Sequence, residues 1–297
     1  MGPFHPSELY RMVNYDGTRN VIKACLALSI RKVVMSSSPS TRFDGSDLDG
    51  LGEDDLPELP LKRYMQVYAE TKALGELAIR AACDGASLLT VAVAPHQVYG
   101  PRDTLFLPNV LEAAGLGRLR VFGNGQNWVC FTYVDNNCHG MILAEQALYP
   151  GSPALGGFYI VTDGATHLYA EGYDYFWDVL DRAGVGMGFA PLHSRRHIPT
   201  CVLYLVAYAC ELFGWLSGVK LKLNPFAARA ATMHRWFRIS SAQRDLHYEP
   251  IVPYTEGWRR TLDWFREHWL STFDPSGAGA RLAVQTRGKI DAQLPRS

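Results

Sequence analysis

Apolar residues follow two patterns along the chain, short unbroken runs and longer stretches with helical spacing. The clearest runs are KVVM at 32–35, LLTVAVA at 88–94 and FYIVT at 158–162. Unbroken runs of this length, rich in β-branched residues, are typical of strands buried on both faces of a parallel sheet. We therefore predict buried strands at these positions, with further strands at 119–122 and 129–134.

Stretches with apolar residues at helical spacing lie between the strands. The predicted helices cover residues 7–28, 64–82, 107–114, 135–148 and 173–183. Ser7 and Asp135 begin two of these stretches, and a short polar side chain at that position can cap a helix. Strands that alternate with amphipathic helices indicate an α/β fold, in which helices cover a parallel sheet.

The most apolar stretch of the chain, residues 198–221, allows three interpretations. It could form a buried core helix, dock on a bilayer interface, or cross the bilayer. Glu211 disfavours a crossing, because an acid at the centre of a span costs about 2.5–3.5 kcal/mol, whereas each Leu or Val returns only about 0.3–0.6 kcal/mol. Trp215, Lys220 and Lys222 fit an interface, but they fit the end of a soluble helix equally well.

Charge and cysteine content narrow the possible functions. Lys plus Arg and Asp plus Glu both number 29, so the formal net charge is zero and no general basic surface points to nucleic acid. The six cysteines form no C-x-x-C pair and the first residues show no secretory signal pattern, which predicts a reduced, intracellular protein. His193 and His197 lie four residues apart without an evident third ligand, so we predict no metal site.

Tyr68 and Lys72 are the first candidates for chemistry. Their i, i+4 spacing places both side chains on one face of the predicted helix. A tyrosine hydroxyl has a reference pKa of about 10, but an ammonium group within about 4–6 Å stabilises the phenolate and lowers that pKa. Such a tyrosine can exchange a proton with a carbonyl or an alcohol. The spacing alone is weak, because such a pair is usually an ordinary feature of a helix surface.

A serine run directly after the first predicted strand strengthens this candidate. Ser36, Ser37 and Ser38 follow the strand at 32–35, and ligands of parallel sheets bind beyond the carboxyl ends of strands. A serine hydroxyl there can hold the substrate oxygen on which the tyrosine acts. The order of strand, serines, loop, helix with Tyr68 and second buried strand therefore indicates a site at this edge of the sheet.

Four motifs in this order resemble those of the extended short-chain dehydrogenases: VVMSSSPS, VYAETKALGE, APHQVYGPRD and FTYVDNNCHGMILAEQAL. VNYDGTRNVIKAC also resembles that family's helix before the serine strand. The chain is most similar to the 3β-hydroxysteroid dehydrogenase branch, and within it to the sterol-4α-carboxylate 3-dehydrogenases (decarboxylating). The features that support this similarity are FYIVTDG, the apolar segment IPTCVLYLVAYACELFGWL and the ending RISSAQRDLHYEPIVPYTEGWRRTLDW.

The resemblance assigns roles to individual residues. It implies that Tyr68 is the catalytic acid/base, and that Lys72 lowers its pKa and binds the ribose hydroxyls of the nicotinamide. It implies that Ser38 hydrogen-bonds the substrate oxygen, with Ser37 as the alternative if the register is shifted by one. Asn14 matches an asparagine near the site.

Pro95 and Val98 match the segment that passes the nicotinamide. Simpler interpretations stay open: Asn14 could be an ordinary polar helix residue, and Pro95 could only end a strand. The resemblance further implies a partial Rossmann-like, NAD(P)-binding parallel sheet over residues 1–165. A smaller substrate-binding region would follow at 166–270, and we expect a disordered tail at 271–297.

The reaction implied by the resemblance is hydride transfer from a sterol 3β-carbon to NAD or NADP, and the sequence does not distinguish these cofactors. Oxidation beside a 4α-carboxylate gives a β-keto acid, which loses CO2 because the ketone accepts the electrons as an enolate. The implied partners are a sterol, a membrane surface and a second copy of the chain, bound through the helix that carries Tyr68. The implied location is the cytoplasmic face of the endoplasmic reticulum membrane.

The glycine-rich phosphate loop of the family is not found before the strand at 32–35. The G-x-G-x-G run at 184–188 follows a predicted helix and is interpreted as a helix-ending turn. The resemblance therefore predicts an N-terminally truncated sequence that lacks three β-α units of roughly 25–30 residues each. Without them, the strand at 32–35 would lose a neighbour and expose an apolar edge.

Three functional alternatives follow. The chain could be a fragment of an active dehydrogenase, or a short chain that binds no cofactor and is inactive or a scaffold. It could also be a nucleotide-sugar epimerase or dehydratase of the same superfamily, although the apolar segment at 198–221 argues against a sugar substrate.

Overall fold

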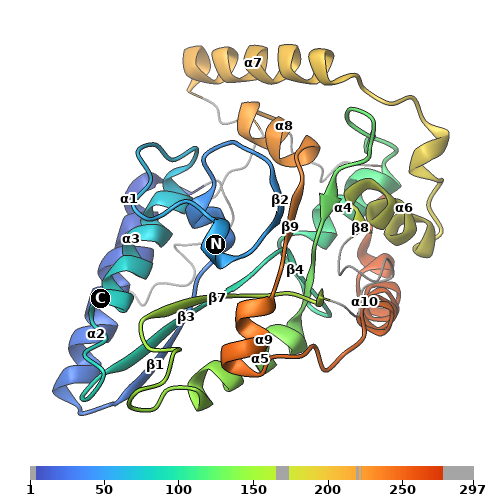
Figure 1. Cartoon of the computed structure of the whole chain (residues 1–297). Helices are drawn as coiled ribbons and strands as arrows, with labels where there is room; N and C mark the ends of the chain where they lie inside the picture. The colour runs from blue at the N-terminus through green and yellow to red at the C-terminus, as the bar shows by residue number, and fades with distance from the viewer. Residues whose placement is uncertain (1–4, 165–173, 219–220, 222, 277–297) are drawn as a thin grey trace.

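The computed structural model of the protein describes residues 5–164, 174–218, 221 and 223–276. Most of the tail predicted at 271–297 lies outside these residues. The described residues form strands and helices in layers, which confirms the predicted α/β class (Figure 1).

Three predicted strands pair to form a parallel sheet. They are β1 (Lys32–Ser36), β3 (Leu89–Pro95) and β7 (Gly157–Val161), in the order β1-β3-β7. β3 lies between the other two, and its residues are buried up to Ala94, as expected for a central strand. β1 lies at the edge of the described sheet, and its central residues 33–35 are only half-buried. The apolar edge predicted for this strand is therefore present in the described part of the chain.

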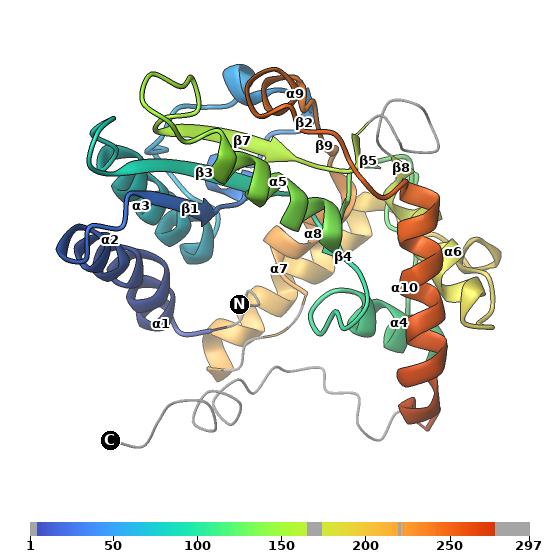
Figure 2. The ribbon, with the colours of Figure 1, turned by 90° about the horizontal axis from the view of Figure 1, so that it is seen from below.

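Helices cover both faces of this sheet (Figure 2). α2 (Gly17–Ala27) and α3 (Val67–Ala81) pack against each other on one face, where α3 contacts β3. α5 (Val134–Gln146) crosses β1 and β3 on the opposite face, and α9 (Ser240–Leu246) contacts β7. The helix predicted at 64–82 is confirmed, although it begins three residues later.

The predicted helix at 7–28 is confirmed as three consecutive segments. α1 covers Ser7–Arg11, a π-helical segment (η1) covers Met12–Asp16, and α2 follows directly. Short π-helical segments are rare and frequently lie at functional sites. The predicted cap is wrong, because Ser7 is already helical and the residue before it is Pro6, which has no side-chain donor or acceptor.

A second sheet joins segments that are far apart in the sequence. Its order is β2 (Leu48–Leu51), β9 (Arg235–Phe237), β5 (Trp128–Val129) and β8 (Asp174–Tyr175), and β4 (Val98–Tyr99) pairs separately with β6 (Thr132–Tyr133). The strand predicted at 129–134 is therefore split between two sheets. The strand predicted at 119–122 is wrong, because Phe122 makes only a single bridge, to Ile198.

The start of α5 also differs from its prediction. Asp135 does not cap the helix, which begins one residue earlier and has Tyr133 before it. Asp135 is exposed in the first turn, whereas the neighbouring Asn136 points inward and donates a hydrogen bond of 2.8 Å to Asp163 Oδ1. The buried amide therefore fixes this end of the helix to the strand end near Asp163.

Two hydrophobic cores stabilise these layers. The first surrounds β3 and β7 and includes Met233 and Tyr248 from the C-terminal part of the chain. The second joins Tyr99 and Phe131 to the helices α4 (Leu107–Gly115), α6 (Phe176–Gly186) and α10 (Tyr254–His268). Each core takes residues from both sides of position 165, so the division into two regions there stays a prediction.

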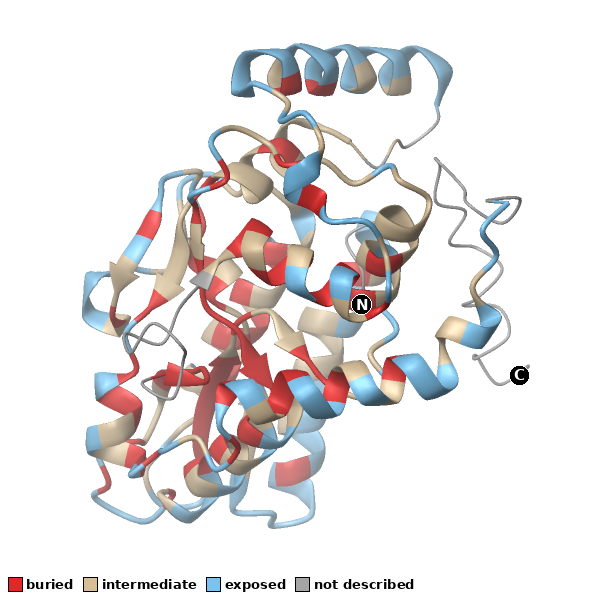
Figure 3. Cartoon of the chain, turned by 90° about the vertical axis from the view of Figure 1, so that its right-hand side faces the viewer, coloured by how far each residue is buried: buried red, intermediate tan, exposed pale blue. Residues whose placement is uncertain are grey.

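The apolar segment forms a helix that lies at the edge of the molecule. α7 (Thr200–Ser217) rests on α8 (Pro225–Thr232), and only Leu203 and Ala207 are buried (Figure 3). Its length and composition are sufficient to cross a membrane, and 11% of it is buried. The interpretation as a buried core helix is wrong, since the apolar side chains on its outer face have no cover among the described residues.

Candidate active site

Tyr68 and Lys72 lie in the first two turns of α3, next to the carboxyl end of β1. Both side chains are half-buried, and the Lys72 ammonium group donates a hydrogen bond to the backbone oxygen of Ser36. Tyr10, from α1, packs edge-on against the Tyr68 ring with their centroids 5.8 Å apart. The predicted pair is therefore placed at the carboxyl end of the sheet, as its spacing and the serine run required.

The expected lowering of the Tyr68 pKa is not present in this arrangement. Burial raises the pKa of Tyr68, and the nearby Tyr10 raises it further. Burial lowers the pKa of Lys72, which the Glu76 carboxylate partly offsets. The physical reason is that both groups are removed from water, while the ammonium is directed to Ser36.

The two candidate serines have different environments. The Ser37 hydroxyl is buried and donates a hydrogen bond of 2.7 Å to Glu76 Oε2. Ser38 is half-buried, and its Oγ accepts hydrogen bonds from the Ser40 backbone N–H and hydroxyl at 3.3 and 2.9 Å. The Ser38 hydroxyl can still donate to a substrate oxygen, so the geometry favours Ser38 over Ser37.

Asn14 lies in the π-helical segment and contacts the helix that carries the tyrosine. Its Nδ2 donates a hydrogen bond of 3.0 Å to Thr71 Oγ1, and its backbone oxygen accepts one of 2.8 Å from Thr18 Oγ1. Thr71 precedes Lys72, so the Asn14 amide is bonded between the two candidate catalytic residues along α3. A role for Asn14 in holding the site is consistent with this contact and stays a prediction.

Pro95 and Val98 end β3 and begin β4, on either side of a tight segment. His96 lies between them, and its Nδ1 is 2.7 Å from the backbone oxygen of Cys130. Burial lowers the pKa of His96 to about 3, so its ring is neutral at pH 7. The sequence did not single out His96, because its role depends on a contact with a distant strand.

A buried ion pair behind the serines was also missed by sequence reasoning. Arg42 Nη1 donates a hydrogen bond of 2.8 Å to Glu76 Oε2, and the Glu76 side chain is fully buried. Glu76 follows Lys72 by four residues, and this spacing is the signal that would have placed both on one face of α3.

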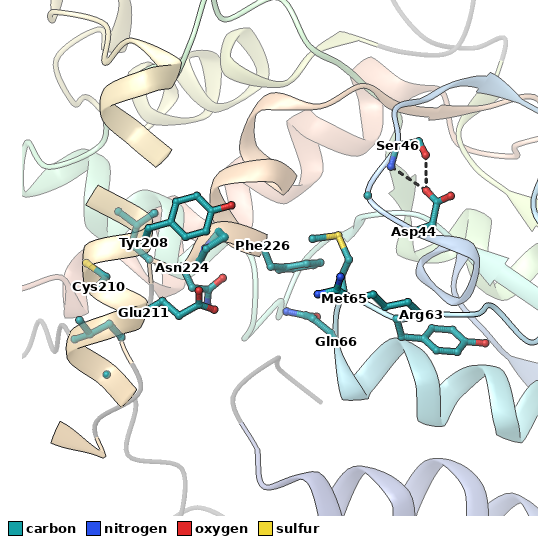
Figure 4. A pocket seen from close by; sticks show the side chains of 16 residues that line it. Asp44, Ser46, Arg63, Met65, Gln66, Tyr208, Cys210, Glu211, Asn224 and Phe226 are labelled. Atoms are coloured by element: carbon teal, nitrogen blue, oxygen red, sulfur yellow. Dashed lines mark hydrogen bonds between the residues drawn. The ribbon is translucent and has the colours of Figure 1, made fainter. Parts of the chain in front are cut away.

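A cavity of about 880 Å³ opens between α7 and the segment that leads into α3 (Figure 4). Tyr208 and Glu211 approach it from α7, and Arg63 and Gln66 from the opposite side. Phe226 contributes an apolar wall from α8. The volume is in the range of small-molecule sites, and Gln66 stands two residues before the candidate catalytic tyrosine.

The described residues contain no group of three or more His, Cys, Asp or Glu side chains able to hold a metal ion. His193 Nε2 is instead 2.8 Å from Asp178 Oδ1. All six cysteines are free thiols.

The residues present fit one end of a dinucleotide cofactor. The Tyr68 hydroxyl and the Lys72 ammonium are donors suited to ribose and nicotinamide oxygens. Pro95 ends the neighbouring strand β3, and Val98 begins β4. Within residues 5–164, 174–218 and 223–276, no glycine-rich turn joins a strand to a helix in the manner of a phosphate loop. The run at 184–188 ends α6, as predicted, with Gly188 at a φ of 84°.

Comparison with sequence families matches residues 1–183 to the 3-beta hydroxysteroid dehydrogenase/isomerase family. The chain is 36% identical over 269 residues to human sterol-4-alpha-carboxylate 3-dehydrogenase, decarboxylating, which covers 87% of this chain and 68% of that protein. It is 34% identical over 267 residues to 3beta-hydroxysteroid-dehydrogenase/decarboxylase isoform 1 of Arabidopsis thaliana. The match covers 87% of this chain and 58% of the Arabidopsis protein.

A bacterial relative has a different named activity. The chain is 32% identical over 262 residues to 2-alkyl-3-oxoalkanoate reductase of Stenotrophomonas maltophilia, with 87% of this chain and 76% of that protein covered.

Solved structures show the same fold at low sequence identity. The structure of gox2253 has a TM-score of 0.64 and 21% identity, and covers 89% of this chain and 75% of its own. A double mutant of DesIV, a dTDP-glucose 4,6-dehydratase of Streptomyces venezuelae with NAD and DAU bound, has a TM-score of 0.62 and 19% identity. The match covers 90% of this chain and 70% of the DesIV chain. These similarities confirm the Rossmann-like fold. The sequence matches over most of its length show that this chain belongs to the 3-beta hydroxysteroid dehydrogenase/isomerase family.

Proposed function

We propose that this protein oxidises the 3β-hydroxyl of a sterol, using NAD or NADP, and that the sterol bears a 4α-carboxylate that is lost as CO2. The main support is the placement of Tyr68, Lys72 and Ser38 near the carboxyl end of β1, where the Lys72 ammonium group contacts Ser36. The cavity with the apolar wall is lined by Gln66, two residues before Tyr68, and not by these three residues themselves. The relatives named as sterol dehydrogenases support the substrate class.

The proposed roles follow from the chemistry of each side chain. Ser38 would donate a hydrogen bond to the 3-oxygen, and Tyr68 as phenolate would take the hydroxyl proton while the hydride leaves C3. Lys72 would stabilise the phenolate. The buried tyrosine needs this stabilisation because burial raises its pKa. Tyr68, Lys72, Pro95 and Val98 would hold the nicotinamide end of NAD or NADP, which would supply the hydride-accepting chemistry when bound.

An acid group on the substrate would also find a charged partner. Arg63 lines the cavity and makes no ion pair within the described part of the chain. After oxidation, the bond between C4 and the carboxylate carbon breaks, CO2 leaves, and the electron pair passes to the C3 ketone as an enolate that is then protonated. A guanidinium group that holds the carboxylate before oxidation would orient the substrate.

We further propose that α7 contacts a membrane surface, at the cytoplasmic face of the endoplasmic reticulum. Leu205, Leu212 and Leu216 lie on one face of the helix and are 72%, 58% and 70% exposed. A sterol is stored in the bilayer, so a surface that docks beside the cavity would shorten its path. Homodimerisation through α3 is a separate proposal, which the oligomeric state in solution would test.

Replacing Leu205 by aspartate should weaken binding of the chain to phosphatidylcholine vesicles by about ten-fold or more, because burial of a leucine contributes about 1.5–3 kcal/mol and each 1.4 kcal/mol is a factor of ten. Vesicle co-sedimentation measures the change. Leu28→Asp, which changes a 71% exposed leucine at the end of α2, is the matched control and should bind normally. Equal binding of wild type and Leu205→Asp would exclude α7 as the contact.

Turnover by the purified chain tests the main proposal. With a 4α-carboxysterol and NAD+ or NADP+, we expect reduced cofactor and CO2 to form in equal amounts. Absence of sterol turnover together with turnover of a nucleotide sugar would favour the epimerase alternative. If calorimetry detects no binding of either cofactor, the alternative of an inactive or scaffolding chain is favoured.

A further inference from the structure

Glu76 is a fully buried acid in line with the proposed catalytic residues. It follows Lys72 by one helical turn and Tyr68 by two, so the three side chains leave α3 on the same side. Its relative exposure is 0%, although an ionised carboxylate is costly to bury without partners. Its position therefore requires a reason beyond ordinary helix packing.

The partners of Glu76 come from the turn that follows β1. Ser37 Oγ donates a hydrogen bond of 2.7 Å to Oε2, and Arg42 donates one of 2.8 Å to the same oxygen and a second to Oε1. Arg42 is 5% exposed, and its guanidinium carbon lies 3.5 Å from the centroid of the Phe158 ring. Arg80, on α3 itself, is 3.6 Å away at Oε1. The carboxylate is thus held at two points of one short turn.

Ser38 lies within the turn that Glu76 holds. It follows Ser37 directly, and its backbone oxygen accepts hydrogen bonds from the Thr41 N–H at 3.1 Å and the Thr41 hydroxyl at 2.9 Å. Arg42 is the next residue after Thr41, so the two Glu76 contacts enclose Ser38 on both sides. Lys72 adds a third tie between the same face of α3 and this segment, through Ser36.

We propose that Glu76 and Arg42 act as a positioning pair, which fixes the Ser38 hydroxyl relative to the Tyr68 hydroxyl. This inference rests on the proposed function and assigns neither residue a contact with substrate. The two hydroxyls are carried by different elements, and both must meet one substrate oxygen. Displacement of a reacting group by about 1 Å can cost on the order of 100-fold in rate.

The test removes both charges together, because Glu76→Gln alone would leave Arg42 as a buried unpaired cation and could prevent folding. In the double variant Glu76→Leu/Arg42→Met, apolar groups replace both partners, an exchange that is often tolerated in protein interiors. We expect a folded protein with kcat lower by about 10- to 100-fold and KM for the cofactor nearly unchanged. The single variant Glu76→Asp keeps the negative charge, so its kcat should lie between those of the double variant and the wild type.

Glu145→Gln is the matched control, since it removes an acid from the exposed Lys32–Glu145 pair. It should leave kcat unchanged. A folded double variant with wild-type kcat would overturn the proposal.

A second readout separates this proposal from the proposed function itself. If the wild-type chain shows no sterol turnover, the function fails first, and 3-fluorotyrosine at position 68 then reports the geometry. We expect its ¹⁹F resonance to shift or broaden in the double variant and to stay unchanged in Glu145→Gln. A ¹⁹F resonance that is identical in wild type and double variant would overturn the positioning role whether or not the chain turns over sterols.

Discussion

Replacing Tyr68 by phenylalanine is expected to lower turnover by about 10²–10⁴-fold, the contribution typical of a positioned acid/base. The phenyl ring keeps its edge-on contact with Tyr10, so the fold should change little. The affinity for NAD(P)+ should fall by about ten-fold at most, because a single hydrogen bond contributes about 0.5–1.5 kcal/mol. The loss should fall on kcat, because the missing hydroxyl acts on the substrate proton in the transition state. Steady-state kinetics and calorimetry with the cofactor measure the two quantities.

Tyr149→Phe is the control for this change, since it removes the same hydroxyl from a ring that is 55% exposed and lies in the loop after α5. It should have wild-type kinetics. Turnover by Tyr68→Phe within a factor of two or three of wild type would remove Tyr68 from the proposed mechanism, and the raised pKa of its buried hydroxyl would then reflect packing alone.

The raised pKa of Tyr68 also gives Lys72 a specific task. In the arrangement described, the ammonium group is hydrogen-bonded to Ser36 and does not lower the tyrosine pKa. For Tyr68 to accept a proton near pH 7, the ammonium must stabilise the phenolate more strongly than it does here. A cofactor ribose that hydrogen-bonds both side chains would change their environment at the moment when the substrate is bound.

The central strands and the helix with Tyr68 could be predicted because their signals are local. β3 is an unbroken apolar run, and the order of serines, helix and second strand predicted a candidate site at the carboxyl end of β1. The second sheet could not be predicted. β9 and β5 are three and two residues long and pair across about a hundred residues of sequence, so neither has a periodic pattern.

The elements missed at the site depend on tertiary contacts. Ser37 and Glu76 appear in the sequence as a turn residue and a surface-type acid, and only the folded chain brings them to 2.7 Å. The π-helical segment is likewise invisible in the sequence, because nothing in MVNYD distinguishes it from an α-helical turn. The burial of α7 could not be inferred either, since an apolar helix has the same composition whether it faces a core or a membrane.

The largest stability effect at the site is expected from Gly75→Ala. A Cβ at this position would lie 2.3 Å from the backbone oxygen of Asn14 and 3.2 Å from Thr18 Oγ1. Backbone cannot move aside as a flexible side chain can, so α2 and α3 must separate, and such overpacking typically costs about 1–3 kcal/mol. Urea unfolding should show this loss, and turnover of the folded variant should fall because the Asn14–Thr71 hydrogen bond lengthens.

Gly184→Ala is the matched control, because Gly184 is also a helix residue but its added Cβ would meet only Ala114 Cβ at 3.5 Å, an ordinary contact. Removal of a helical glycine without strain should stabilise the chain by about 0.4–1 kcal/mol. Both substitutions add one methyl group to a helical glycine, but the first is expected to destabilise the fold and the second to stabilise it. If Gly75→Ala were also stabilising, the close approach of α3 to the π-helical segment would be excluded, and with it the contact that holds Asn14 beside the residues proposed for catalysis.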